Sequence, residues 1–129
     1  MFIKYENNKI RNVTPGIFEG LKSLSELHLE RNMIEVLEDD AFQGCTSLKE
    51  LYLDGNAIST VYPSAFKNLT GIKQIILNKN KLEKLPTNLF QDLTELTYLG
   101  LANNSINTTT DLFNNLQQCQ SVNQNYNEF

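Results

Sequence analysis

One block of sequence recurs along this chain at a constant interval, and this repetition restricts the fold more than any other feature. Residues 24–47 read LSELHLERNMIEVLEDDAFQGCTS, residues 48–71 read LKELYLDGNAISTVYPSAFKNLTG, and residues 72–95 read IKQIILNKNKLEKLPTNLFQDLTE. Each copy starts 24 residues after the one before it. A fixed period of this size predicts stacked units that bury one continuous core, which is the architecture of a solenoid.

The repeat accounts for the whole chain, so we expect a single domain, residues 1–129. Its parts are a partial repeat 1–23, the repeats 24–47, 48–71, 72–95 and 96–118, and a partial repeat 119–129. The fifth copy departs from the pattern, because Thr109 replaces an aliphatic residue and Phe113 and Leu116 come one residue early. Because the chain enters and leaves in mid-repeat, we expect that end caps are absent and that it is a piece of a longer protein.

Within each copy, apolar and other residues alternate in a way that predicts a short strand. Leu27 and Leu29 illustrate this period of two, which turns one set of side chains inward and the other outward. Stacked in parallel about 4.8 Å apart, these strands would form a concave sheet. The predicted fold class is α/β: a repeat solenoid with a concave parallel β-sheet and with turns and short 3-10 segments on its convex side.

Two residue types recur at fixed positions, and we assign both to the structure of the repeat. An Asn follows each strand, where its amide can bond the backbone of its own and of the neighbouring turn. These residues are Asn8, Asn32, Asn56, Asn80, Asn104 and Asn127. A Phe recurs later in each copy and is predicted to stack as a column under the convex side: Phe18, Phe42, Phe66, Phe90 and Phe113.

The repeat resembles the typical 24-residue class of the leucine-rich repeat family. The residues that carry the resemblance are LSELHLERNMIEVLEDDAF, LKELYLDGNAISTVYPSAF and IKQIILNKNKLEKLPTNLF. Similar members are Toll and Toll-like receptor ectodomains, Slit-type guidance proteins and secreted insect immune proteins. The resemblance implies a non-enzymatic binding module of innate immunity, adhesion or guidance, with a protein ligand or one that bears lipid or glycan. It also implies that the chain is extracellular or secreted, or belongs to the ectodomain of a membrane protein.

Charge and composition argue against several other classes of function. The net charge of −4 argues against nucleic acid as a partner, because nucleic-acid binding favours a basic face. No stretch is long and apolar enough for membrane insertion, and the first residues do not form a signal peptide. His28 is the only His and should face away from Cys45, so we expect no catalytic pair, no metal and no cofactor. Cys45 and Cys119 lie three repeats apart, beyond disulfide reach, and should be free. The alternative for Cys119 is a disulfide with a cysteine in an end cap of a longer parent protein.

The outward-facing residues of the predicted sheet are the candidate ligand contacts. The central column runs through Lys4, His28, Tyr52, Ile76, Gly100 and Asn123. Within it, His28, Tyr52 and Ile76, with Tyr98 beside them, form an amphipathic strip of the kind that anchors interfaces. Acidic columns flank the strip and are predicted to steer a partner: Glu26 and Glu50 on one side, and Glu6, Glu30 and Asp54 on the other.

Two alternatives for the acidic columns remain open. Interleaved cations could neutralise much of their field and leave only a solvated face: Arg31, Lys49, Lys73 and Lys79. A calcium site formed by Glu6, Glu30 and Asp54 is a weaker alternative, since nothing resembles a dedicated calcium loop.

Four N-x-S/T sequons favour passage through the secretory route, with glycans at Asn12, Asn68, Asn103 and Asn107. We expect Asn12, Asn68 and Asn107 to lie off the strands, on turns or on the convex side. Asn103 borders the concave sheet, where a glycan would shade that end of the face.

A second hypothesis of function is structural. Here the uncapped ends of the solenoid dock onto other repeats and give homotypic association.

Overall fold

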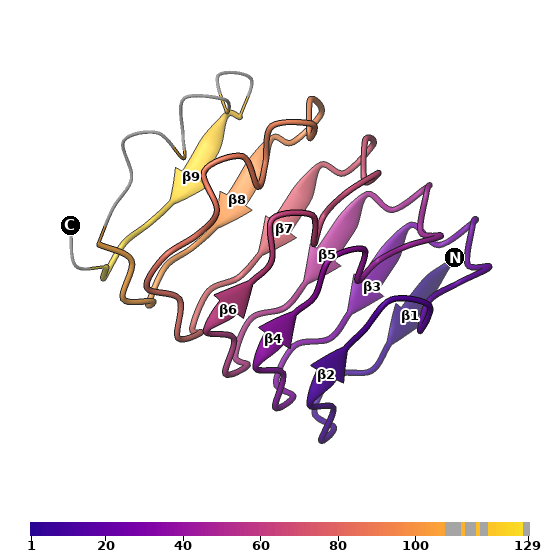
Figure 1. The fold of residues 1–129 in the computed structure, drawn as a ribbon, viewed down its shortest axis with the longest axis horizontal. Coiled ribbons are helices and arrows are strands. Elements are labelled where there is room, and N and C mark those ends of the chain that lie inside the picture. The colour runs from indigo at the N-terminus through magenta and orange to yellow at the C-terminus, as the bar shows by residue number, and fades with distance from the viewer. Residues whose placement is uncertain (108–111, 113–115, 117–118, 128–129) are drawn as a thin grey trace.

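The computed structural model describes residues 1–107, 112, 116 and 119–127, which coil into a stack of similar turns (Figure 1). One strand of each turn joins a six-stranded parallel sheet in the order β1-β3-β5-β7-β8-β9. These strands are β1 (Phe2–Lys4), β3 (Glu26–His28), β5 (Glu50–Tyr52), β7 (Gln74–Ile76), β8 (Tyr98–Gly100) and β9 (Ser121–Asn123). The predicted solenoid with a concave parallel sheet is confirmed, and we call this sheet the concave sheet.

The register of the concave sheet follows the period of the sequence. Leu27 of β3 pairs with Leu51 of β5, which pairs in turn with Ile75 of β7. All three side chains are fully buried, because they point into the coil and stack on their counterparts in the adjacent turns. Between β8 and β9 the step shortens by one residue, so that Leu99 pairs with Val122. Residues 24 apart thus become nearest neighbours across the sheet.

A second, three-stranded parallel sheet was not predicted from the sequence. It consists of β2 (Asn12–Val13), β4 (Val36–Leu37) and β6 (Thr60–Val61), in that order. Val13 and its counterparts in β4 and β6 are buried in the core, whereas Asn12 faces solvent. The expectation that Asn12 lies off the strands was therefore wrong. Two residues per turn are too short a stretch for a period of two to be recognised.

The convex side consists of separate turns. Glu19 N donates to Gly16 O at 3.2 Å and Leu21 N donates to Phe18 O at 3.3 Å, which are hydrogen bonds of the 3-10 type. The convex turns expected from the sequence are therefore present, but among the described residues they do not extend into 3-10 or α-helical segments. The reason lies in the backbone: Gly16 and Gly20 have φ angles of 91° and 86°, a left-handed conformation that stops a right-handed helix from continuing.

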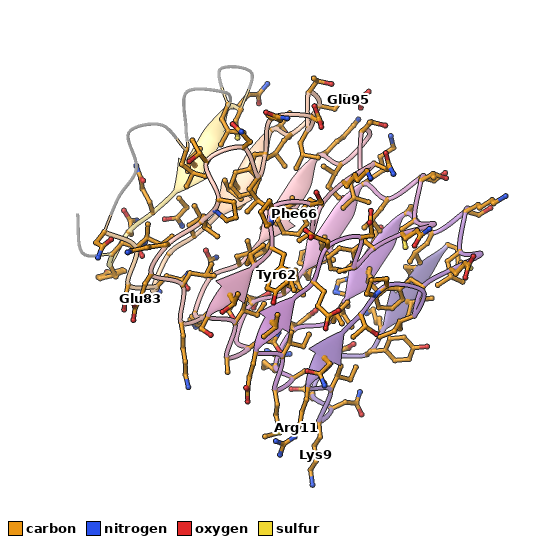
Figure 2. All side chains as sticks on the ribbon, viewed as in Figure 1. Lys9, Arg11, Tyr62, Phe66, Glu83 and Glu95 are labelled. Atoms are coloured by element: carbon orange, nitrogen blue, oxygen red, sulfur yellow. The ribbon has the colours of Figure 1, made fainter. Side chains whose placement is uncertain are left out.

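Stacked aromatic rings fill the core behind these turns. Phe18, Phe42, Phe66 and Phe90 form a column in which adjacent ring centroids lie 6.0 Å apart. All four are buried, and Figure 2 labels Phe66 among the side chains that fill the coil. Phe113, the fifth expected member, lies outside the described residues.

A ladder of Asn side chains joins each turn to the preceding one. The Asn56 amide nitrogen donates at 3.0 Å to Leu29 O of the preceding turn and to Leu53 O of its own turn. Its oxygen accepts at 3.1 Å from Asn32 N and Ile34 N of the preceding turn. Equivalent bonds between turns are made by Asn32, Asn80, Asn104 and Asn127. The ladder forms hydrogen bonds to the backbone N–H and C=O groups at the point where the chain leaves the sheet. Without the ladder these groups would be buried without partners.

Replacing Asn56 with Ala should therefore destabilise the chain strongly. The substitution deletes four hydrogen bonds and leaves backbone groups unsatisfied, at about 1–3 kcal/mol for each group that stays buried. We expect the free energy of unfolding, measured in urea, to fall by about 3 kcal/mol or more. The control is Asn88→Ala at an exposed position, which should change it by less than about 0.5 kcal/mol. Equal effects of the two substitutions would contradict the structural role of the ladder.

Candidate functional site

Two stacked rings lie at the middle of the outward face of β3 and β5. His28 and Tyr52 are register partners, with ring centroids 4.3 Å apart and ring planes inclined by only 6°. Ile76 of β7 is the next register partner of Tyr52, so the three side chains form a continuous strip across three strands. All three are partly exposed. Register brings together here three of the four residues that the sequence predicted as anchors.

The strip ends at β8 because no side chain continues it. Gly100 pairs with Ile76, and the amide of Asn78 covers it: a Cβ atom on Gly100 would lie 2.8 Å from Asn78 Oδ1. That oxygen accepts a hydrogen bond from Ala102 N at 2.8 Å, which holds the amide in place. Tyr98, the fourth predicted anchor, lies in the neighbouring column opposite Gln74 and so flanks the strip instead of extending it.

Carboxylates bracket the stacked rings through hydrogen bonds and close charges. His28 Nδ1 lies 3.0 Å from Glu30 Oε1, and His28 Nε2 lies 3.7 Å from Glu26 Oε2. The Tyr52 hydroxyl donates to Glu50 Oε2 at 2.5 Å. Each of these pairs joins residues two apart along a strand or its extended continuation, whose side chains share a face. We call His28, Tyr52, Glu26, Glu30, Glu50 and Asp54 the acidic-aromatic patch.

The electrostatics of the patch follow from burial and from negative charge. The hydrogen bond to Glu50, burial and the nearby carboxylates raise the pKa of Tyr52 to about 12. Burial raises the pKa of Asp54, and the charge of Glu30 adds to this effect, while a backbone hydrogen bond and the charges of Arg31 and Lys79 oppose it. Glu30 Oε2 is shielded from solvent and has no hydrogen-bond partner. The patch is therefore a partly desolvated, negative surface.

The basic side chains near the patch do not pair with its carboxylates. Arg31 Nε donates to Asn7 Oδ1 at 2.8 Å, and Lys49 Nζ lies 4.0 Å from Glu95. Within the described ranges, no Lys or Arg forms an ion pair with a carboxylate of the patch. Of the cations predicted to neutralise the acidic columns, Arg31 and Lys79 act at longer range, on Asp54.

The calcium alternative has no support in the geometry. Glu6 lies beside Glu30, since Asn7 N donates to Glu30 O at 3.1 Å. Even so, in the part of the chain that the structure describes, no group of three or more His, Cys, Asp or Glu is placed to hold a metal ion.

Cys45 and Cys119 are both free, and burial raises the pKa of each thiol. Cys45 lies in the core while His28 lies on the outward face of β3, so the two cannot act as a nucleophile and its base.

All four sequon Asn residues are exposed. Asn68 lies on a convex turn with a φ of 67°, and Asn103 has a φ of 56° just past the end of β8. Asn12 lies in β2, and Asn107 follows the ladder residue Asn104 of its turn.

A hollow in the first turn was missed by the sequence analysis. This cavity of about 280 Å³ is lined mainly by apolar side chains, including Tyr5, Ile10, Val13, Ile17 and Phe18. Ile17 is 53% exposed and Tyr5 46%. In the later turns the equivalent core positions are covered by a neighbouring turn, so the partial first repeat was the signal that could have revealed the hollow.

Solved structures similar to this chain are built from the same repeat. The leucine-rich repeat domain of APL1B matches with a TM-score of 0.91 and 25% identity over 98% of this chain. TLR13 in a crystal structure of its complex with ssRNA13 matches with a TM-score of 0.85 and 26% identity over 90%. The chain spans only 38% of the APL1B chain and 17% of the TLR13 chain. No curated protein sequence matches it significantly.

The likeness to TLR13 bears on one prediction from sequence, and the structure itself bears on another. Because TLR13 was crystallised with RNA, the comparison does not support the exclusion of nucleic acid as a partner. Among the described residues, no helix is long and apolar enough to cross a membrane.

The repeats themselves match a known family directly. The profile of the leucine rich repeat covers residues 6–58 and again 47–106, which together make up most of the chain. The matched segments hold the concave strands β3, β5, β7 and β8, every ladder Asn except Asn127, and the strip of His28, Tyr52 and Ile76. This protein is a member of the leucine-rich repeat family.

Proposed function

We propose that the chain is a non-enzymatic recognition module that binds a protein ligand on its concave sheet. The observation that carries this proposal is the continuous strip of His28, Tyr52 and Ile76, partly exposed on the outward face of three adjacent strands. The family and its similar structures are in general binding modules without catalytic activity, which supports the same reading.

The strip suits an anchor because it combines apolar area with fixed geometry. Tyr side chains offer a large contact area with few rotatable bonds, and they are enriched among residues that dominate binding energies. Stacking on His28 and the hydrogen bond to Glu50 hold the Tyr52 ring before any ligand arrives. Less side-chain entropy is then lost on binding. Tyr98 would extend the contact on β8.

The parent protein that we propose is an extracellular recognition protein of innate immunity, adhesion or guidance. The likeness to APL1B and to TLR13 supports this, although the chain matches only a part of each. Exposure of Asn12, Asn68, Asn103 and Asn107 supports passage through the secretory route, since a glycan at any of them would meet solvent. The net charge of −4 favours protein over nucleic acid as the ligand.

A second candidate function, association through the end of the solenoid, rests on the first turn. Phe2 is 62% exposed on the edge strand β1, and Ile17 borders the open cavity. Asn8 donates only to Tyr5 O and Glu6 O of its own turn, whereas each later ladder Asn also bonds the turn before it. The surface of the first turn is thus complementary to a further repeat, and a second copy of the chain could supply one.

The concave site can be tested by position-specific crosslinking. A photo-crosslinking residue in place of Gln74, which lies beside the strip, should capture a discrete protein from native extracellular fluid. The same residue in place of Tyr62, on the opposite side of the coil (Figure 2), should not. Replacing Tyr52 and Ile76 with Ala should then weaken binding of the captured protein by about 2 kcal/mol or more. Unchanged affinity would move the site to an edge or to the convex side.

Glycosylation can be tested by mass. Protein from a eukaryotic secretory host should lose mass on enzymatic deglycosylation, and Asn68→Gln should remove one glycan because Asn68 is exposed on a turn. Asn88→Gln, at an exposed Asn outside any sequon, is the control and should change nothing. Absence of any mass loss would contradict the secretory assignment.

End-to-end association can be tested by the concentration dependence of molar mass. If the first turn associates, light scattering should give a mass that rises above 14.7 kDa with concentration, and Phe2→Glu with Ile17→Lys should abolish the rise. Tyr62→Glu with Met33→Lys introduces the same two charges at exposed apolar residues outside the first turn and should leave association intact. A constant monomer mass would eliminate this second candidate.

A further inference from the structure

We infer that the acidic-aromatic patch recognises an arginine side chain presented by the protein ligand. This inference rests on the proposed function and adds the chemistry of the partner: a segment that carries at least one guanidinium group toward β3 and β5.

Negative charge recurs at the outward positions of these strands and of the residues just after them. Glu26 and Glu30 come from one repeat, and Glu50 and Asp54 from the next. Glu26 and Glu50 are direct register partners, and like charges in that arrangement destabilise a sheet. A cation bound between them would offset the repulsion.

Burial and missing partners make the patch more than a solvated acidic face. The Glu30 side chain is only 15% exposed, and its Oε2 atom is buried without any hydrogen-bond partner. Such a carboxylate oxygen has lost its hydrogen bonds to water without gaining others, which costs free energy. A hydrogen-bond donor from outside the chain could offset this cost. No Lys or Arg of the described residues pairs with a carboxylate of the patch, so that donor does not come from the chain itself.

The aromatic stack selects among cations. A guanidinium is planar and can lie against the face of the Tyr52 ring while its N–H groups reach carboxylates at the edge. Glu26 and Glu50 lie on one side of the stack, and Glu30 and Asp54 lie on the other. A guanidinium that lies over the rings can therefore donate hydrogen bonds to carboxylates on both sides. An ammonium is a compact charge with no planar face, and it cannot combine stacking with bidentate bonding. Arginine should therefore bind more tightly than lysine.

Fluorescent hexa-arginine is a suitable probe, with hexa-lysine and neutral hexa-citrulline for comparison. We expect saturable binding of hexa-arginine by anisotropy, weaker binding of hexa-lysine, and none of hexa-citrulline, which keeps the shape of arginine without its charge. Glu30→Gln with Asp54→Asn should weaken the binding of hexa-arginine by about tenfold or more, because the charge-assisted hydrogen bonds are lost.

A matched pair of substitutions controls for overall charge. Glu83→Gln with Asp92→Asn removes two exposed carboxylates that have no ion pair in the structure, and Glu83 lies at the loop edge away from β3 and β5 (Figure 2). This control should change the affinity by less than about twofold, since distant exposed charges are screened by salt. Equal losses in the two variants, or equal binding of arginine and lysine peptides, would overturn the inference.

The outcome separates this inference from the proposed function. If hexa-arginine does not bind while the Gln74 crosslink to a protein persists and depends on Tyr52 and Ile76, arginine recognition is wrong and the concave site stands. If neither is observed, both are wrong. If hexa-uridylate binds and hexa-arginine does not, the patch does not recognise cations and the inference fails.

Discussion

Hydrogen bonding between adjacent turns is the constraint on which the rest of this structure depends. Parallel strand pairing joins the turns along the concave sheet, and the Asn ladder joins them where the chain leaves it. Both kinds of bond form only if each turn places its backbone N–H and C=O groups next to the matching groups of the adjacent turn. The period of 24 residues meets this requirement, and the buried Leu, Ile and Phe columns fall into line as a consequence. If one turn lost this register, the buried Leu, Ile and Phe side chains of the two adjacent turns would lose their cover and meet solvent.

The same constraint creates the candidate site. His28 and Tyr52 are far apart in sequence, yet register makes them neighbours close enough to stack. Their flanking carboxylates are brought together in the same way, so negative charge that is spread along the sequence becomes concentrated on one face. A repeat protein can thus build a binding surface by varying only the outward residues, while the inward residues maintain the stack.

Sequence reasoning predicted the elements that depend on periodicity and missed those that depend on local geometry. The inward Leu positions and the columns through His28 and Tyr52 follow from counting residues. The short sheet through Asn12 could not be predicted, since two residues per turn carry too little pattern. The separate convex turns depend on left-handed φ angles at residues such as Gly16. The cover of Asn78 over Gly100 and the shielded Glu30 oxygen depend on side-chain conformations, which a repeat pattern does not encode.

The central claim is that the stacked pair on the concave sheet contacts the ligand, and ring resonances can report this directly. His28 is the only His of the chain, and Tyr52 is one of five Tyr residues, so their ring signals can be assigned by substitution. During a titration with hexa-arginine, the His28 and Tyr52 signals should shift together and saturate at one dissociation constant, while those of the exposed Tyr62 and Tyr126 stay in place. Shifts confined to Tyr62 or Tyr126, with His28 unmoved, would contradict binding of the arginine ligand by the stacked pair on the concave sheet.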